Sequence, residues 1–357
     1  MSMFIFDKLD LNQILSTFSS INKNVSFYSS LTFIPIGMCL NLLMVYIYVA
    51  RMRSTTARLI LLSTCLAIVD AFSLSFGLAV HLSLSLDYDL REANDFWCKF
   101  LNYFSKYFIK VSSWFHVLIT IDRTLNICYR DRFKMLKSRR IQLYIVSCML
   151  ILLGIAFFAD AFYYVDEQSM NSTTTSNVTV NNAYLLDKSK CVITKTFAVL
   201  SDTIATLFRT ILPFSFMLAA SLVVILKMIR SRRQANLSRN QRDIHFCRTL
   251  LILNLVFVFA QLPLSLVQLA RNIVLFLPNA STDLVDCLNM FDTICFMVVY
   301  FYQASQFFIH ILTNKHFNSE LFSIFTHSKS HLSSVKRSLV NNKSSNKNNS
   351  NNNQARH

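Results

Sequence analysis

Seven long apolar segments make up most of this chain, and they restrict what it can fold into. About 20 apolar residues in a helix span the ~30 Å hydrocarbon core of a bilayer, and each segment is near or above that length. Charged residues are only 15% of the chain, whereas soluble domains hold about 25%. We therefore predict an all-α membrane protein, a seven-transmembrane helix bundle. Its expected spans are Leu31–Ala50, Leu59–Leu86, Phe100–Ile121, Ile141–Val165, Phe197–Ile229, Leu250–Leu277 and Cys287–Leu312.

The net charge of +16 is distributed unevenly between the two sides of these spans. If the amino terminus lies outside, 24 of the 35 Lys and Arg residues fall in the inner loops and the carboxyl-terminal tail, and only 7 fall in the outer parts. Basic residues concentrate on the cytoplasmic side of membrane proteins, so we predict a multi-pass plasma-membrane protein with its carboxyl terminus in the cytosol. The charge then reflects topology and attraction to anionic lipid, and it does not indicate nucleic-acid binding.

The remaining segments complete the predicted domain organisation. Residues 1–30 form an extracellular amino terminus without a cleavable signal peptide, so that the first span inserts as a signal anchor. Residues 31–325 form the membrane domain, which ends in a short amphipathic eighth helix because apolar residues recur every four positions from Phe317. Residues 326–357 are mainly Ser, Asn and Lys, and we expect this cytoplasmic tail to be disordered.

The outer parts of the chain carry signals for covalent modification. Asn171-Ser-Thr and Asn177-Val-Thr, both in the longest outer loop, match the glycosylation pattern in the right compartment. Three cysteines, Cys98, Cys191 and Cys287, lie toward the oxidising outside. We expect two of them to form a disulfide and the third to remain a free thiol.

Six polar side chains lie in the outer halves of the third, fifth and sixth spans. Lys106 and Lys110 are four residues apart and therefore share a helix face. Cations that converge on a cavity favour a ligand with carboxylate, sulfate or carbonyl groups. The alternative is mutual neutralisation inside the protein by Asp160, Asp202 and Asp292. The candidate ligand-binding residues are Lys106, Lys110, Arg209, Gln261, Gln268 and Arg271.

Two further sites hold ionisable residues within or at the ends of the spans. The third span ends in Asp122-Arg123. An Arg costs about 2.5 to 3.5 kcal/mol at the middle of a membrane helix, so Arg123 either has a function or anchors the helix at the interface. Asp243 lies twenty residues before Pro263 of the sixth span. Asp70 lies mid-membrane, where an ionisable group suggests a function and a hydrogen-bonded structural role is the alternative.

A set of residues spread along the spans matches one family of membrane proteins in order and spacing. The set comprises Asn41, Leu66–Asp70, Trp97-Cys98, Asp122-Arg123, Cys191, Pro213, Phe257–Pro263 and Phe317. It resembles the rhodopsin-type (class A) G-protein-coupled receptors, in which a Cys opens the third helix and an Asp-Arg pair closes it. The resemblance extends over nearly everything from Leu31 to Phe325.

This resemblance implies a function and a set of partners. A receptor of this type binds an extracellular peptide or small ligand and activates a heterotrimeric G protein. In the family, an acid at the position of Asp243 holds the Arg equivalent to Arg123 at rest, with Asp122 beside it. Its release lets the sixth helix swing outward and open a cleft for the G protein. The serines of the tail would serve a receptor kinase and arrestin.

The resemblance also implies a disulfide and an ion site. The family pairing predicts a bond between Cys98 and Cys191. The family's sodium pocket uses the residues equivalent to Asp70 and Ser112, so the resemblance implies an allosteric Na⁺ ion there and no other cofactor. A structural role for Asp70 remains the competing interpretation, since Gln306 replaces a usual Asn or Asp of that pocket.

Several residues depart from the family pattern, and these departures indicate which branch of the family the chain resembles. Gln306-Phe-Phe-Ile-His310 replaces the usual Asn-Pro-x-x-Tyr at the end of the seventh helix, Thr124 replaces an aromatic residue, and Gln261 replaces a Trp or Phe. A related variant is found in many invertebrate neuropeptide receptors. The chain is therefore most similar to the FMRFamide- or myosuppressin-like branch, and we expect a neuropeptide ligand.

Other functions remain as alternatives. A chemoreceptor for small environmental molecules would use the same fold. A transporter is expected to contain internal repeats with Gly- or Pro-interrupted helices, and only three glycines and four prolines occur here, without a repeat. A ligand-gated channel of reversed topology would need its basic loops outside. No catalytic motif or metal-ligand spacing indicates an enzyme.

Overall fold

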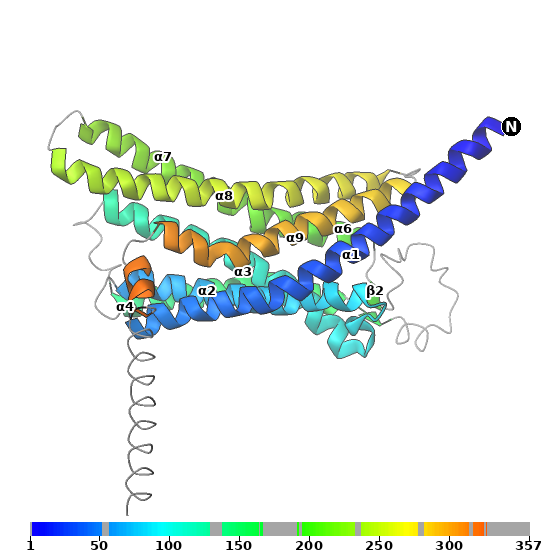
Figure 1. The fold of residues 1–357 in the computed structure, drawn as a ribbon, viewed down its shortest axis with the longest axis horizontal. Helices are drawn as coiled ribbons and strands as arrows, with labels where there is room; N and C mark the ends of the chain where they lie inside the picture. The colour runs from blue at the N-terminus through cyan, green and yellow to red at the C-terminus, as the bar shows by residue number, and fades with distance from the viewer. Residues whose placement is uncertain are drawn as a thin grey trace, which may run out of the picture.

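Long helices account for nearly all of the chain that the computed structural model describes, namely residues 2–51, 57–128, 138–163, 165–166, 191–192, 195–232, 237–277, 282–313, 317–324 and 326. The helices lie alongside one another, with their axes in roughly one direction (Figure 1). In chain order the elements are α1 (Ser2–Tyr46), η1 (Ile47–Arg51), α2 (Ala57–Ser85), η2 (Leu90–Glu92), α3 (Asp95–Cys128), α4 (Arg139–Tyr163), β1 (Val165–Asp166), β2 (Cys191–Val192), α6 (Lys195–Thr206), η4 (Leu207–Ile211), α7 (Leu212–Arg232), α8 (Leu237–Phe276) and α9 (Thr282–Thr313).

All seven predicted spans fall on helices, which confirms the predicted helical membrane bundle. The fifth span is built from α6, η4 and α7 in direct succession. Within the described ranges, six of the seven are long and apolar enough to cross a membrane by themselves, and the exception is α3. α3 carries Lys99, Lys106 and Lys110, and it packs against α2, α4 and α7. A helix enclosed by its neighbours does not need an apolar surface on every side.

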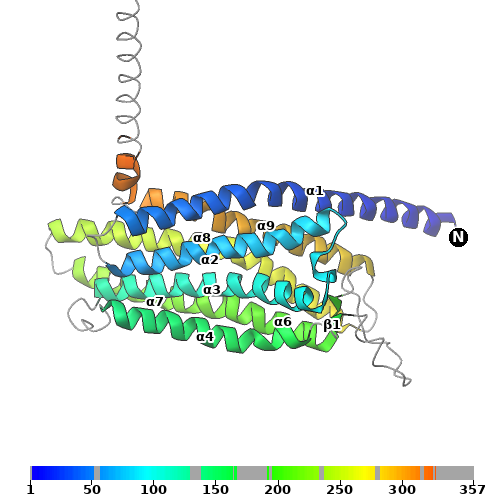
Figure 2. The same cartoon turned by 90° about the horizontal axis from the view of Figure 1, so that it is seen from below.

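The first helix begins much earlier than the sequence predicts. The expected span starts at Leu31, whereas α1 starts at Ser2 and its apolar, membrane-length part starts at Ser20. Figure 2 shows the amino-terminal part of α1 extending past the ends of the neighbouring helices. Lys23 on this part forms an ion pair with Asp87, just after α2, at 2.5 Å. Hydropathy detects where hydrocarbon begins, and a helix can continue beyond that point.

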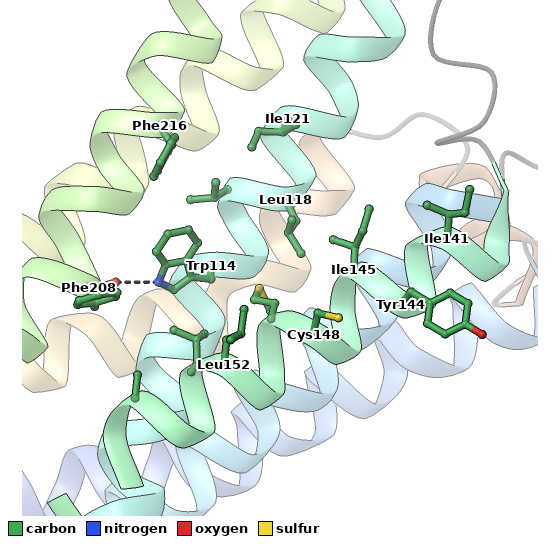
Figure 3. A pocket seen from close by; sticks show the side chains of 14 residues that line it. Trp114, Leu118, Ile121, Ile141, Tyr144, Ile145, Cys148, Leu152, Phe208 and Phe216 are labelled. Atoms are coloured by element: carbon green, nitrogen blue, oxygen red, sulfur yellow. Dashed lines mark hydrogen bonds between the residues drawn. The ribbon is translucent and has the colours of Figure 1, made fainter. Parts of the chain in front are cut away.

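A π-helix interrupts the fifth span where a proline removes a hydrogen-bond donor. In η4 the Leu212 N–H bonds to the Leu207 carbonyl, five residues back instead of four. The next donor in this register would be Pro213, which has no N–H. The indole nitrogen of Trp114 on α3 donates to the Phe208 carbonyl at 3.0 Å (Figure 3). The backbone irregularity in the fifth span therefore comes with a fixed contact to the third.

Two glycines allow three helices to pack closely. A Cβ atom added at Gly77 of α2 would overlap the buried ring of Tyr300 on α9. At Gly37 of α1, an added Cβ would lie 2.6 Å from the side chain of Leu74 and 3.1 Å from that of Ala304. The absence of a side chain at both positions brings α1, α2 and α9 together.

The short helix predicted after the seventh span is present at residues 317–324. Phe317 is fully buried and Leu321 nearly so, and both pack in a cluster with Phe307 of α9. Phe322, on the opposite face, is 64% exposed. One face of this helix is therefore attached to the bundle, as the apolar spacing predicts.

Candidate functional site

Buried charged side chains join several helices in the half of the bundle predicted to face outside. Arg271 on α8 forms ion pairs with Asp202 on α6 and, at 3.1 Å, with Asp292 on α9. Lys106 on α3 lies 3.5 Å from an oxygen of Asp202. Two of the predicted ligand-binding cations thus contact two of the acids proposed as internal partners. The set Lys106, Asp202, Arg209, Gln268, Arg271 and Asp292 is called the outer polar cluster below.

Arg209 contributes to this cluster from η4. Its Nη2 atom donates to Gln268 Oε1 at 2.7 Å, and the Thr206 hydroxyl donates to the same oxygen at 3.2 Å. Arg209 is 4% exposed, and neither its Nε atom nor Asp292 Oδ1 has a hydrogen-bond partner among the described residues. A buried polar atom without a partner costs about 1–3 kcal/mol, so a ligand group that satisfied these atoms would be bound favourably.

Lys110 and Gln261 lie in different surroundings. The Lys110 ammonium lies 3.4 Å from the centre of the Phe157 ring on α4, whereas Lys106 points toward α6. The two lysines therefore contact different helices, although they are four residues apart. Gln261 is 2% exposed, and its Oε1 atom lacks a hydrogen-bond partner in the part of the chain that the structure describes. Both side chains are buried, and the Lys110 ammonium faces α4 and not the outer polar cluster.

The outer end of α3 is covalently attached. Cys98 is disulfide-bonded, and Cys287, the other described outer cysteine, is free. Cys191 begins β2 and lies opposite Asp166 of β1 in an antiparallel pair. The Cys191 side chain lies outside the described residues, so the pairing of Cys98 with Cys191 stays a prediction.

Asp70 lies at the centre of the bundle, fully buried. Ser112, its predicted neighbour, donates a hydrogen bond to one carboxylate oxygen at 2.6 Å. The other carboxylate oxygen, the Ser73 hydroxyl and the side-chain oxygens of Gln303 and Gln306 have no hydrogen-bond partner among the described residues. Hard cations prefer carboxylate, hydroxyl and carbonyl oxygens. The chemistry of these residues therefore fits a sodium ion.

Arg123 is buried at the inner end of α3. It is 5% exposed, and Asp122 and Tyr48 of η1 both lie near its guanidinium group. The Tyr48 hydroxyl also lies 2.9 Å from Nδ1 of His310 on α9. The side chain of Asp243, the predicted resting-state partner, lies outside the described residues. Arg123 thus lies near the inner ends of the first and last spans, which the sequence did not predict.

A contact between α3 and α9 was also not predicted from the sequence. Nε2 of His116 lies 3.1 Å from the Tyr302 hydroxyl and 3.3 Å from Nε2 of Gln306. The imidazole therefore joins α3 to two residues of α9. His116 lies seven residues before Arg123, on the same face of α3, and this spacing was the available signal.

The predicted modification sites cannot be placed. Asn171 and Asn177 lie outside the described residues, and so does the side chain of Asp160. Over the ranges that the structure describes, no group of three or more His, Cys, Asp or Glu side chains is arranged to hold a metal ion. The site residues that can be placed are therefore those of the outer polar cluster, the Asp70 centre and the inner end of α3.

Comparison with known families gives one positive finding. A family model described as 7 transmembrane receptor (rhodopsin family) matches residues 40–305, well over half of the chain. The match includes Asp70, Arg123 and Arg209 and ends one residue before Gln306. No curated protein matches the chain.

Proposed function

Because the chain belongs to the rhodopsin family of seven-transmembrane receptors, we propose that it binds an extracellular ligand in the outer half of the bundle and activates a heterotrimeric G protein at the inner end. Members of this family are multi-pass plasma-membrane receptors and not enzymes. The excess of basic residues in alternate loops supports an amino terminus outside and a carboxyl terminus in the cytosol.

The charge of the outer half supports a ligand with an anionic or carbonyl group. Basic side chains outnumber acidic ones within the outer polar cluster. Its basic residues are Lys106, Arg209 and Arg271, and its acids are Asp202 and Asp292. A ligand carboxylate or sulfate can pair with the excess positive charge through charge-assisted hydrogen bonds. This observation carries the proposed ligand class.

A neuropeptide is the ligand that fits these observations best. A peptide offers carbonyl groups and acidic side chains, and the altered motif from Gln306 to His310 resembles that of invertebrate neuropeptide receptors. A chemoreceptor for small acidic molecules from the environment is the second candidate, favoured by how deeply Arg209 and Gln268 are buried.

The ion pairs of the outer polar cluster suggest how the effect of ligand binding is transmitted to the inner end of the bundle. A ligand anion that pairs with Arg271 competes with Asp202 on α6 and Asp292 on α9, and it changes how α8 is held at its outer end. α8 is one long helix with Pro263 inside it, so its two halves are linked. A ligand shifts the bundle only as far as it binds the two states differently. Movement of the inner half of α8 then exposes Arg123 to the G protein.

The remaining partners are proposed on the basis of the same family membership. We place a sodium ion at Asp70 and Ser112, where it would favour one state of the bundle. Replacing NaCl by choline chloride at constant ionic strength should change agonist affinity, and the change should be absent in Asp70→Asn. An unchanged sodium response in that variant would remove the ion site. The serines of the tail are proposed to serve a receptor kinase and arrestin.

A ligand screen tests the receptor function directly. Cells that express the full chain are exposed to a neuropeptide library, and signalling is followed with a panel of promiscuous G proteins. An active peptide should give no signal in Arg123→Ala cells at equal surface expression, and it should still bind them. Full signalling by Arg123→Ala would overturn the coupling mechanism. Activation by cationic amines alone would overturn the ligand class.

A further inference from the structure

One buried polar side chain interrupts the apolar inner half of α8. Every residue from Leu251 to Ala260 is apolar except Asn254, which is 8% exposed. An Asn side chain in a membrane helix hydrogen-bonds across to neighbouring helices, because hydrocarbon offers it no other partner. Asn254 belongs neither to the outer polar cluster nor to the Asp70 centre. Its contacts therefore indicate a role that those sites do not cover.

The amide of Asn254 connects α8 to two other helices. Its oxygen accepts a hydrogen bond from the Thr120 hydroxyl of α3 at 3.2 Å. Its nitrogen donates to the Ser221 hydroxyl of α7 at 2.7 Å and to the Met217 carbonyl at 3.5 Å. Both hydroxyl side chains are buried. The oxygen and the nitrogen of this amide are thus both satisfied as long as the three helices keep this arrangement. The set Thr120, Ser221 and Asn254 is called the Asn254 bridge below.

Hydrogen bonds attach α8 to its neighbours on both sides of Pro263. On the outer side, the Ser265 hydroxyl donates to the Thr210 hydroxyl of η4 at 2.7 Å. On the inner side, where α8 runs alongside α7 (Figure 1), the hydrogen bonds that the structure describes from α8 to α3 and α7 are those of Asn254. A proline removes a backbone hydrogen bond and permits a helix to bend. The inner half of α8 can therefore move about Pro263 once the Asn254 bridge opens.

The position of the Asn254 bridge makes it sensitive to such a movement. Asn254 lies nine residues before Pro263, about 14 Å along the helix at 1.5 Å per residue, whereas α8 starts at Leu237, about 39 Å from the proline. A rigid swing about Pro263 therefore displaces Asn254 by roughly a third of the displacement at the start of α8. Hydrogen bonds weaken beyond about 3.2 Å, so an opening of about 3 Å at the start of α8 is enough to break the bridge.

The bridge is intact while the coupling residue is covered. Arg123, which is proposed to contact the G protein, is 5% exposed in this structure. Thr120 lies three residues before Arg123, about one turn earlier on α3. The Asn254 bridge therefore attaches α8 to α3 directly beside Arg123 in the closed arrangement of the inner end.

We propose that the Asn254 bridge is a latch that holds the inner half of α8 against α3 and α7, and that its opening is a step in activation. Asn254 is then a positioning residue, which acts on the exposure of Arg123 through the placement of α8. The proposal rests on the receptor function proposed above, and it is independent of the restraint proposed for Asp243. All three side chains of the bridge are neutral, so the latch needs no ion pair.

Single-molecule fluorescence tests the latch without agonist or G protein. Two fluorophores are introduced through unnatural amino acids into the purified full-length receptor. One replaces Arg140, which is exposed near the start of α4, and the other replaces Ser238, the second residue of α8. Energy transfer between them separates molecules in which the inner end of α8 is close to the bundle from those in which it is displaced. Each lost bond should raise the displaced fraction about threefold, which corresponds to about 0.6 kcal/mol for a hydrogen bond between membrane helices.

Variants of the bridge give graded expectations. Asn254→Leu removes the bonds to Thr120 and Ser221 with a side chain of similar size, and it should raise the displaced fraction about ninefold. Thr120→Val removes one bond and should raise the fraction about threefold, whereas Thr120→Ser keeps the hydroxyl and should leave it unchanged. Added to Asn254→Leu, Thr120→Val should have no further effect because its partner is already absent. Ligand-independent signalling in cells should follow the same order.

A matched control lies on the outer side of the proline. Ser265→Ala removes a hydrogen bond of 2.7 Å from α8, so thermal stability should fall while the displaced fraction stays unchanged. A displaced fraction in Asn254→Leu and Thr120→Val no higher than in Ser265→Ala would show a purely structural contact and would overturn the proposal. If Asn254→Leu does not fold, the comparison of Thr120→Val with Thr120→Ser decides the question. A raised displaced fraction without any signalling in cells would support the latch and would count against the proposed receptor function instead.

Discussion

The Tyr48 hydroxyl lies 2.9 Å from Nδ1 of His310, and this contact joins the π-helical end of the first span to the seventh. Tyr48 is 2% exposed and His310 3%. Arg123, on α3, lies near both side chains. The inner ends of the first and seventh spans are therefore joined by one buried polar contact, and the inner end of α3 lies beside it.

A double-mutant cycle measures the strength of that contact. A hydrogen bond contributes about 0.5–1.5 kcal/mol to stability, so Tyr48→Phe and His310→Ala should show a coupling energy in that range. Thermal unfolding of the purified receptor in detergent provides the measurement. Tyr46→Phe, on an exposed side chain of the same helix, is the control and should leave stability unchanged. A coupling energy of zero would mean that the contact contributes nothing.

Removing a cation from the outer polar cluster should weaken the response to agonist. Lys106→Ala or Arg209→Ala should raise the half-maximal agonist concentration tenfold or more, since a hydrogen bond to a charged group contributes about 1.5–3 kcal/mol. Surface expression should stay near normal. Arg91, which pairs with Asp89 outside the cluster, is the matched control. Unchanged potency in both variants would favour internal neutralisation of these cations.

Changes at the inner switch should alter signalling without ligand. Asp243→Asn removes one proposed restraint on Arg123 in the resting state. A loss of about 1 kcal/mol, the upper end for a partly exposed ion pair, multiplies the active population about fivefold. Basal signalling should therefore rise by that factor. A flat basal signal in Asp243→Asn would remove the proposed lock.

The outer disulfide should join Cys98 to Cys191. Cys98 is bonded and Cys287 is free, which leaves Cys191 as the expected partner. Mass spectrometry of peptides from the non-reduced protein identifies the bonded pair. Reduction should separate the two peptides. A peptide that links Cys98 to Cys287 would contradict both the structure and the prediction.

A methyl group at position 77 should destabilise the bundle. Gly77→Ala places a Cβ atom into the ring of Tyr300, and overpacking of this kind costs about 1–3 kcal/mol. The thermal midpoint of the purified receptor should fall accordingly. Gly154→Ala is the control, because its Cβ would meet the Tyr103 hydroxyl at 3.6 Å and the Tyr107 hydroxyl at 4.0 Å, which are ordinary contact distances. Equal midpoints for the two variants would show that α2 and α9 can separate at little cost.

The sequence predicts the fold well because membrane spans are recorded in local composition. Each of the seven apolar stretches lies on a helix, and even α3 was found despite its lysines. The start of α1 was missed because a helix outside hydrocarbon has no apolar signal. The pairing of Tyr48 with His310 and of His116 with Gln306 was missed because such contacts depend on how distant helices rotate against each other.

The lysines of α3 show the limit of periodicity in one helix. Lys106 and Lys110 share a face, yet one contacts Asp202 and the other Phe157. Residues four apart differ by about 40° around a helix, and a long side chain amplifies that difference. The two lysines therefore have different partners although they lie on the same face of α3. The acids that pair with the outer cations were named from the sequence, but which cation meets which acid required the structure.

Pro213 has a consequence for the ligand end of the fifth span that local bonding does not reveal. The wide turn before it holds one residue more than an α-helical turn, and each residue corresponds to about 100° of rotation. The extra residue therefore sets the rotation of α6, including Asp202 and Thr206, about the helix axis relative to α7. If the turn closed to an α-helix, these side chains would rotate away from Arg271 and Gln268. The direction in which the ligand-facing side chains point around the helix axis thus depends on a proline that does not contact them.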